Sequence, residues 1–257
     1  MRRLAIFVVL GSGLCGCSHP DSSASPSVAG GPTPASSLSN PPAAPSTAPS
    51  SAPVSSAVVS KPAMALTSLA QELRSDAYEY YGLGNDKPVK LAFRKDSSPV
   101  PMATRTVKLV AVKDGKASFE EQQIGGLEDE TQTMSLEPDG LYVMAASSGT
   151  LKTPHTLELP SKLSKGTEWQ DNQELESQGT TIKLDGKYRV VGFEDVKTQA
   201  GPFPNALHVV GAIKGTRGGV PVSMSVEDWY AKGIGLVKQR LTVSGTLKVT
   251  VTSEATK

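Results

Sequence analysis

The sequence predicts a mainly β protein: a curled antiparallel meander of about 10–12 strands, shaped as a half-barrel or open barrel, with one N-terminal helix and a disordered tether in front of it. Three observations predict this fold. Apolar and polar residues alternate along much of the second half of the chain, turn signals separate the alternating runs, and no helical crossover pattern interrupts them. Alternation of period two is typical of antiparallel strands with one covered face, whereas parallel strands need crossover connections.

Residues 1–16 are predicted to be a lipoprotein signal peptide. Arg2 and Arg3 supply a positive charge, and a short apolar run over residues 4–10 follows them. This run is too short to cross a bilayer as a helix, which takes about 20 apolar residues. Its length and its basic flank are typical of a secretory signal.

The end of this segment reads Leu14-Cys15-Gly16-Cys17, which resembles the bacterial lipobox. The resemblance implies cleavage after Gly16, a diacylglycerol on the sulfur of Cys17 and a further acyl chain on the freed amine. Stable anchoring takes more than one acyl chain, and such a group meets that requirement. Ser18 follows Cys17 in place of Asp, which implies an outer-membrane anchor with the protein facing the periplasm. The alternative is an ordinary signal peptide in which both cysteines are incidental.

Residues 17–62 are predicted to be the lipidated cysteine followed by a disordered linker. From Ser18 to Pro62 there are 14 Ser, 10 Pro and 8 Ala among 45 residues, and no aromatic residue. Such a segment buries too little apolar surface to offset the entropy of ordering it, and dispersed Pro blocks helices. As a random coil it would span about 40 Å. This predicts a spacer; a Pro-rich ligand for an aromatic-lined groove is the alternative.

Residues 63–257 are predicted to form a single antiparallel β domain that begins with the helix. Apolar residues that recur at spacings of three and four, and so share one helix face, are Leu66, Leu69, Leu73 and Ala77. The tyrosines of residues 78–81 end this segment, and the glycines of residues 82–84 break it. The apolar face of the helix needs a partner, and the concave face of the curled sheet is the expected one.

The strands of the domain are predicted from alternation and from turn signals. The clearest alternating runs lie at residues 106–111, 207–214, 220–227 and 247–252. Asp114-Gly115, Asp139-Gly140 and Asp185-Gly186 each stand between strand-like stretches, so each is predicted to form a tight hairpin turn. An antiparallel sheet of this size tends to curl or close.

Four motifs follow one another in the C-terminal half of the chain. They are Gly166-Thr167-Glu168-Trp169, Tyr188-Arg189-Val190-Val191-Gly192, Ala200-Gly201-Pro202-Phe203 with Ala206-Leu207-His208-Val209, and Trp229-Tyr230-Ala231-Lys232-Gly233-Ile234-Gly235-Leu236-Val237-Lys238. In this order they resemble the TapB-like bacterial envelope lipoproteins, whose function is not established. The resemblance implies a curved antiparallel sheet, similar in outline to periplasmic lipoprotein-carrier folds, and a cell-envelope location. It implies no catalytic residues.

The aromatic residues of these motifs are expected to have structural roles. Trp229 and Tyr230 should pack on opposite faces of their strand, just before a turn in which Gly233 and Gly235 supply positive φ. Trp169 lies early in its own strand. Residues 201–204 are predicted to form a rigid turn that presents Phe203, with packing against its own sheet favoured over insertion into a partner.

Composition and motifs exclude several classes of function. With 26 Lys and Arg against 25 Asp and Glu, the net charge is +1, which disfavours nucleic-acid binding. Two Cys build neither a disulfide framework nor a four-thiolate zinc site. A nucleophile elbow, a zinc-binding helix motif and a phosphate-binding loop are absent from the sequence. We therefore expect no enzymatic activity, no cofactor and no metal site.

The remaining candidates for chemistry are expected to be structural. His155 follows a proline at the edge of a strand, and His208 lies on the polar side of an alternating run, so neither is expected to be catalytic. The acidic residues Glu128-Asp129-Glu130 lack the spacing that calcium needs and are expected to form a solvated loop. Glu120-Glu121 and Glu227-Asp228 are expected to be similar surface pairs.

The sequence favours a lipid-anchored cell-envelope protein that acts as a binding or scaffolding module. Its curved sheet would bind another envelope component, for example by strand addition, and the tether would let the domain search a large volume. The alternative is a carrier or sensor of an apolar ligand, such as a lipid or a lipoprotein acyl chain, held between helix and sheet. The burial of Leu69, Leu73 and the segment 78–81 discriminates between the two. An enzyme is the third hypothesis.

Overall fold

The structure, a computed structural model, describes residues 69–245 and 247–257. These residues form one antiparallel sheet of 13 strands in the order β6-β8-β9-β10-β11-β12-β13-β1-β2-β3-β4-β5-β7. The strands are β1 (Val89–Lys95), β2 (Ser98–Lys113), β3 (Lys116–Gly125), β4 (Glu130–Glu137), β5 (Gly140–Ala146), β6 (Thr150–Leu151), β7 (Thr156–Pro160), β8 (Glu168–Ser177), β9 (Thr180–Thr198), β10 (Gly201–Arg217), β11 (Val220–Ala231), β12 (Gly235–Ser244) and β13 (Lys248–Thr256).

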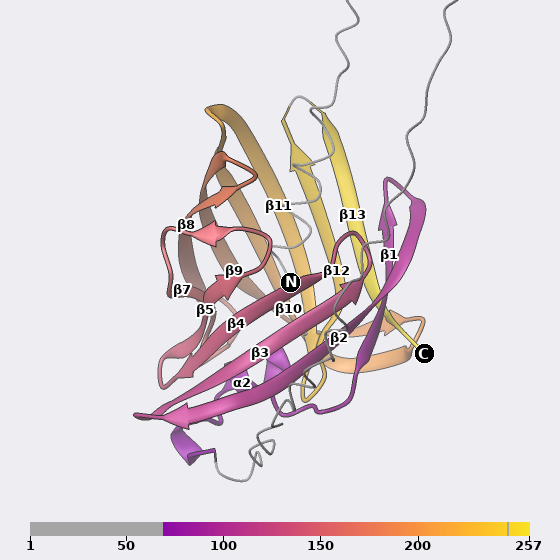
Figure 1. The fold of residues 1–257 in the computed structure, drawn as a ribbon. Coiled ribbons are helices and arrows are strands. Elements are labelled where there is room, and N and C mark those ends of the chain that lie inside the picture. The colour runs from indigo at the N-terminus through magenta and orange to yellow at the C-terminus, as the bar shows by residue number, and fades with distance from the viewer. Residues whose placement is uncertain (1–68, 246) are drawn as a thin grey trace, which may run out of the picture. The chain divides into compact units, whose positions relative to one another are not determined.

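The sheet curls on itself without closing. Figure 1 shows β2, β3 and β4 crossing in front of the strands β10–β12, so that one face of the sheet is concave. The expected fold class, a curled antiparallel meander with one N-terminal α-helix, is confirmed. The described strands exceed the expected range by one, and the shortest, β6, has only two residues.

The N-terminal helix is shorter and begins later than the apolar spacing predicts. A single 3-10 turn, η2 (Gln71–Leu73), precedes α2 (Asp76–Tyr81). Ser75 caps α2, because its hydroxyl accepts a hydrogen bond from the Tyr78 amide, and Gly82 ends it in the left-handed conformation. The tyrosines therefore lie inside the helix, not after it. The predicted position of Leu66 lies outside the described residues.

Of the three predicted Asp-Gly turns, the first is confirmed, the second forms one residue earlier, with Gly140 already in β5, and the third is wrong. Asp114 and Gly115, both with positive φ, join β2 to β3, and residues 138–139 join β4 to β5. Asp185 and Gly186 instead lie within β9. A Cβ on Gly186 would come within 2.7 Å of the Tyr188 hydroxyl, so this glycine makes room for an aromatic ring.

The principal core lies on the inner, concave face of the sheet. Its fully buried members include Leu73 and Ala77 from the N-terminal segment and Phe119, Leu141 and Leu207 from the strands. Leu69, Tyr80 and Tyr81 are also 4% exposed or less. The expected partner of the helix, the concave face of the sheet, is thus confirmed.

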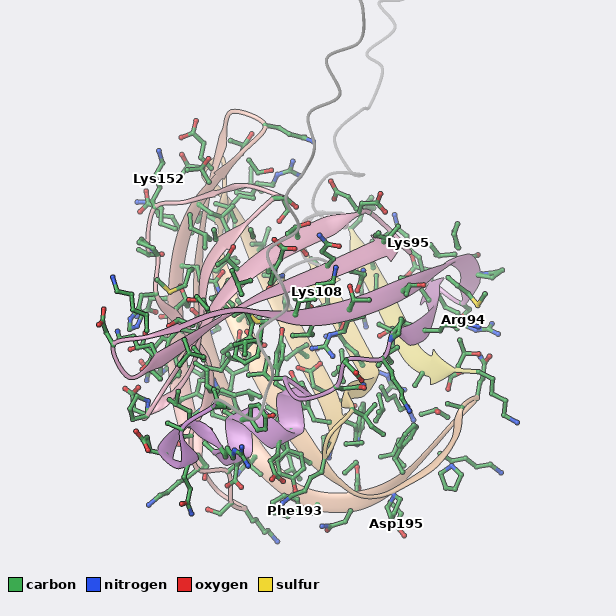
Figure 2. The ribbon with its side chains drawn as sticks, turned by 60° about the horizontal axis from the view of Figure 1, so that its bottom comes forward. Arg94, Lys95, Lys108, Lys152, Phe193 and Asp195 are labelled. Atoms are coloured by element: carbon green, nitrogen blue, oxygen red, sulfur yellow. The ribbon has the colours of Figure 1, made fainter. Side chains whose placement is uncertain are left out.

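A second, smaller core lies where the end of the β9–β10 hairpin bends back over the outer face. We call residues 193–206 the hairpin tip. Register shifts between Phe203 and Ala206 and between His208 and Val209, together with a positive φ at Asn205, bend this hairpin. The second core consists of Val196, Ala206, Trp229, Ala231, Val237 and Ala255, with Phe203 packed against them. Figure 2 shows Phe193 and Asp195 where β9 curves round the end of the molecule.

The aromatic residues of the C-terminal motifs pack on both faces of the sheet. Trp229 belongs to the second core and Tyr230 to the principal core, which confirms that they pack on opposite faces. Gly233 and Gly235 have positive φ, as expected. Phe203 packs against its own sheet, also as expected, but it lies within β10, because the turn is at residues 199–200.

Candidate functional site

A groove of about 370 Å³ runs along the outer face of the sheet beside the hairpin tip. We call it the Trp229 groove. Its lining residues are Ala92, Arg94, Gln199, Glu227, Trp229, Lys238, Gln239, Arg240, Thr252, Ser253 and Glu254. They come from β1, β11, β12 and β13 and from the turn of the hairpin tip, so the site joins the first strand of the domain to the last three.

Strand register explains how the groove is assembled. Across β11, β12, β13 and β1, one cross-strand row is formed by Trp229, Lys238, Glu254 and Ala92. The next row is formed by Glu227, Arg240, Thr252 and Arg94. Residues two apart on a strand share a face and neighbouring strands lie about 4.8 Å apart. Both rows therefore project from the same outer face, while Leu91 and Phe93 of β1 point into the principal core.

Trp229 is held rigidly at one end of the groove. His208 stacks on its ring with a centroid separation of 4.6 Å, and the Lys238 ammonium lies 5.1 Å from the ring centroid. The Glu194 carboxylate accepts a hydrogen bond from the Trp229 indole nitrogen at 2.5 Å, and it lies 3.1 Å from His208 Nδ1. An aromatic ring with a cation over its face is stabilised by its quadrupole. This wall of the groove is therefore preformed.

The hairpin tip closes the groove at its other wall. The Ala200 amide donates to the carbonyl of Ala255 at 3.0 Å, and the Gln199 side chain donates to Glu254 at 2.7 Å. Glu227 forms a long ion pair with Arg240, at 3.8 Å. Arg94 donates to the Ser97 carbonyl and has no ion pair within residues 69–245 and 247–257. The groove thus presents two cations, Arg94 and Lys238, that form no ion pair with a carboxylate of the described residues.

The two histidines contact different residues. His155 stacks on Tyr142 with ring centroids 3.9 Å apart, and its Nε2 lies 2.9 Å from Glu137. His208 stacks on Trp229, which lines the Trp229 groove. Neither histidine contacts a Ser, Thr or Cys nucleophile in the hydrogen bonds of the described residues. The sequence assigned His208 a polar position but not its packing against Trp229.

The expectation that the acidic pairs are surface groups is wrong at three positions. Glu121, Glu130 and Asp228 are only 3%, 5% and 0% exposed. Glu121 lies on the same face of β3 as Phe119, and Glu130 opens β4 opposite Gln123. Asp228 shares the inner face of β11 with Tyr230 and accepts a hydrogen bond from Gln239 at 2.8 Å. Strand parity is the signal that could have placed them.

Arg105 neutralises one of these buried carboxylates. Its Nε and one terminal nitrogen both donate to Glu121, at 2.9 and 2.8 Å. Burial by itself would raise the pKa of Glu121, but the charge and hydrogen bonds of Arg105 hold that pKa below its usual value. Arg105 also donates to the carbonyls of Tyr81 and Ile234. The guanidinium therefore ties β2 and β3 to the end of α2 and to the β11–β12 turn.

These polar groups bear on the apolar-carrier alternative. The side chains Leu69, Leu73, Tyr80 and Tyr81, which would roof an apolar cavity, are themselves buried in the principal core. The inner face next to them carries an ion pair and several carboxamides. The described core therefore gives no support to carriage of a lipid chain beneath the helix.

Two further features of the described residues concern metals and membranes. In that part of the chain, no group of three or more His, Cys, Asp or Glu side chains could hold a metal ion. Its helices include none long and apolar enough to cross a membrane. The predicted signal peptide, Cys17 and the linker lie outside the described residues.

Comparison with known proteins gives a family likeness for the central part of the chain. The model of the DUF3108-like family matches residues 143–241, which extend from β5 into β12 and include the hairpin tip and Trp229. No curated protein matches the sequence.

Two solved structures are similar to the chain. One is a protein described as exported, with a YmcC-like fold, from Bacteroides fragilis; it has 11% sequence identity and a TM-score of 0.48, over 66% of this chain and 94% of that one. The other is a protein described as a lipoprotein from Parabacteroides distasonis, with 8% identity and a TM-score of 0.48, over 66% of this chain and 95% of that one.

Proposed function

We propose that the protein is a lipid-anchored cell-envelope protein that acts as a non-enzymatic binding module. The basic and apolar residues of segment 1–16, the lipobox-like Cys17 and the Ser/Pro/Ala-rich linker support the anchor. The motifs that resemble those of TapB-like lipoproteins support an envelope location, and Ser18 supports an outer-membrane anchor that faces the periplasm. The β domain of residues 63–257 is the part that binds.

The Trp229 groove is the observation that carries the binding role. Its walls are preformed, since Trp229 is stacked and hydrogen-bonded on one side and Gln199 is fixed to Glu254 on the other. A preformed wall lowers the entropy lost on binding. Its volume of about 370 Å³ falls within the range of about 300–1,000 Å³ that is usual for ligand sites.

The charges of the groove favour an acidic polypeptide partner. Arg94, Lys238 and Arg240 line it, against Glu227 and Glu254, and both carboxylates already accept hydrogen bonds or ion pairs from the groove itself. An extended segment of another envelope protein would place a carboxylate side chain at Arg94, where a guanidinium binds both oxygens at once.

Photo-crosslinking in intact cells tests this proposal. A photoreactive amino acid at Thr252, on the floor of the groove, should crosslink one envelope protein, whereas the same residue at Thr242 of β12, outside the groove, should not. Arg94→Glu should reduce the Thr252 crosslink at least about tenfold, a loss of about 1.4 kcal/mol. Lys108→Glu, on the outer face of β2 and labelled in Figure 2, is the matched control. Equal crosslinking in the two variants would contradict the proposal.

A further inference from the structure

A polar patch on the inner face of the sheet contains buried side-chain atoms that have no hydrogen-bond partner among the described residues. It lies on three neighbouring strands, β2, β3 and β4. Arg105, Gln123 and Glu130 form one cross-strand row, and Glu121 and Gln132 are paired in an adjacent row. All five side chains are 5% exposed or less. They therefore form one contiguous buried surface, and their polar atoms must find partners inside the molecule.

In this patch, the unpartnered side-chain oxygens outnumber the unpartnered side-chain nitrogens. Within the described residues, both side-chain polar atoms of Gln123 and the carbonyl oxygen of Gln132 have no hydrogen-bond partner. Gln132 hydrogen bonds to Glu130, and the Ser148 hydroxyl donates to the Glu130 carboxylate at 2.6 Å. A buried polar atom without a partner costs about 1–3 kcal/mol. The two carboxamide oxygens call for a bound group that supplies N–H or O–H donors, whereas the Gln123 nitrogen calls for an acceptor.

The charges of the patch do not balance either. Arg105 is engaged by Glu121 and by two backbone carbonyls, so its charge is compensated. Glu130 is 5% exposed and has no cationic partner in the described part of the chain. Burial raises the pKa of Glu130, and the hydrogen bonds from Ser148 and Gln132 only partly offset that rise. The missing group is therefore a donor that also carries a positive charge.

The opposite edge of the sheet repeats the arrangement. On β8, the amide nitrogen of Gln173 donates to Asp171, and the Gln173 carbonyl oxygen is left without a partner. Gln173 is 8% exposed. The hydroxyl of Ser177, at the end of the same strand, donates to the carbonyl of Ser148, whose own hydroxyl binds Glu130. Two walls of the concave face thus each present a carboxamide oxygen in need of a donor.

We propose that the inner face of the sheet binds a ligand with a primary ammonium group, held by the Glu130 carboxylate and by the carboxamide oxygens of Gln123 and Gln132. An ammonium offers three donors and one positive charge, which match the acceptors and the uncompensated carboxylate of the patch. This site lies on the opposite face of the sheet from the Trp229 groove. The test of the ammonium site is therefore independent of the proposed partner of the groove.

Calorimetric titration of the mature full chain, purified in a non-ionic detergent, tests the proposal. The probe is 1,4-diaminobutane, and 1,4-butanediol is its uncharged match. At physiological ionic strength, where the Debye length is about 8 Å, weak binding to exposed carboxylates is screened. We expect the diamine to bind and the diol not to bind. Failure of the diamine to bind at millimolar concentrations, or equal binding of the diol, would overturn the proposal.

Variants separate the buried site from the surface. Glu130→Gln keeps the shape and removes the charge, and it should weaken diamine binding at least about tenfold. Glu120→Gln, on the same strand β3 as the patch but on its opposite face, is the matched control and should leave binding unchanged. Gln123→Met provides a second variant in case Glu130→Gln fails to fold, and it should also weaken binding. Equal binding by all the folded variants would place the diamine elsewhere and reject the site.

Discussion

Arg105 joins separate parts of the fold through one buried guanidinium. Its donors bind Glu121 on the neighbouring strand and the carbonyls of Tyr81 and Ile234, which belong to α2 and to the β11–β12 turn. A cation at the C-terminal end of a helix also interacts favourably with the helix dipole. One side chain thus fixes the position of the helix against the inner face of the sheet.

Removing Arg105 should destabilise the protein strongly. In Arg105→Met, the Glu121 carboxylate stays buried without its cation, which costs about 3–5 kcal/mol. The double variant Arg105→Met/Glu121→Leu removes both charges and should recover part of that loss. Urea unfolding followed by circular dichroism measures both. A single variant within about 1 kcal/mol of wild type would contradict this role.

Tyr142 should make stability depend on pH in the alkaline range. Burial and its hydrogen bond to Asp139, at 2.7 Å, raise its pKa from 10.0 to about 12. The folded state keeps the phenol proton that the unfolded chain loses above pH 10, so this contribution to stability is present below pH 10 and is lost as the pH rises to about 12.

Tyr142→Phe tests the assignment, because it removes the titrating group and keeps the ring that stacks on His155. Between pH 10 and 12, the free energy of unfolding should fall less steeply in this variant than in wild type. The difference should be a fraction of the full linkage slope of about 1.4 kcal/mol per pH unit, since the ring is only partly buried. Parallel curves for the two proteins would contradict the assignment.

The sequence predicts the character of some single residues but not their partners. Strand parity from Phe119 places Glu121 on the inner face, yet a charged residue is expected at the surface unless its counter-ion is known. That counter-ion, Arg105, is on a different strand, and its register with β3 cannot be deduced from composition. The burial of Glu121 is therefore missed for a physical reason: its ion pair with Arg105 overrides the usual exposure of charge.

At the scale of elements, alternation predicts strands well and predicts their turns less well. Asp185-Gly186 has the sequence of a tight turn, but β9 passes through it without turning. Tyr188, two residues further on, lies over Gly186 and over Gly211 of β10. The turn forms instead at Gln178-Gly179, where both residues have positive φ. The packing of the Tyr188 ring against two glycines favours a continuous strand at Asp185-Gly186 and a turn at Gln178-Gly179.

Gly211 should tolerate no side chain. A Cβ at this position would lie 2.4 Å from Cδ1 of Tyr188 and 2.8 Å from Cγ1 of Val226. Overpacking of this kind costs about 1–3 kcal/mol, so Gly211→Ala should lower the denaturant midpoint. Gly245→Ala is the control, because its nearest contact would be at 3.7 Å. Equal stabilities of the two variants would show that the ring of Tyr188 moves aside.

At the scale of the whole molecule, long-range register assembles the groove. Arg94 comes from the first strand of the domain and Trp229 from the eleventh, and they share a site only because β1 pairs with β13. The C-terminal motifs point to this region, since Ala206, Trp229, Ala231 and Val237 all belong to the second core. Their meeting under the hairpin tip depends on two bulges that no spacing in the sequence indicates.

The predicted anchor connects this domain to the envelope, and the two cysteines of the signal region provide an internal test. Cys17 is the expected site of lipidation and Cys15 lies within the removed peptide. In cells fed radiolabelled palmitate, wild type and Cys15→Ala should both carry the label, whereas Cys17→Ala should carry none and should keep its signal peptide.

The acyl chains alone are expected to hold the protein at the membrane, because each of their buried methylene groups is worth about 0.8 kcal/mol. Cys17→Ala should therefore lose the label while the β domain keeps its fold, as judged by an unchanged circular dichroism spectrum. Labelled Cys17→Ala, or loss of label in Cys15→Ala, would show that the lipobox reading is wrong. The domain would then have no lipid anchor, and the high effective concentration that anchoring gives at the membrane surface would be lost.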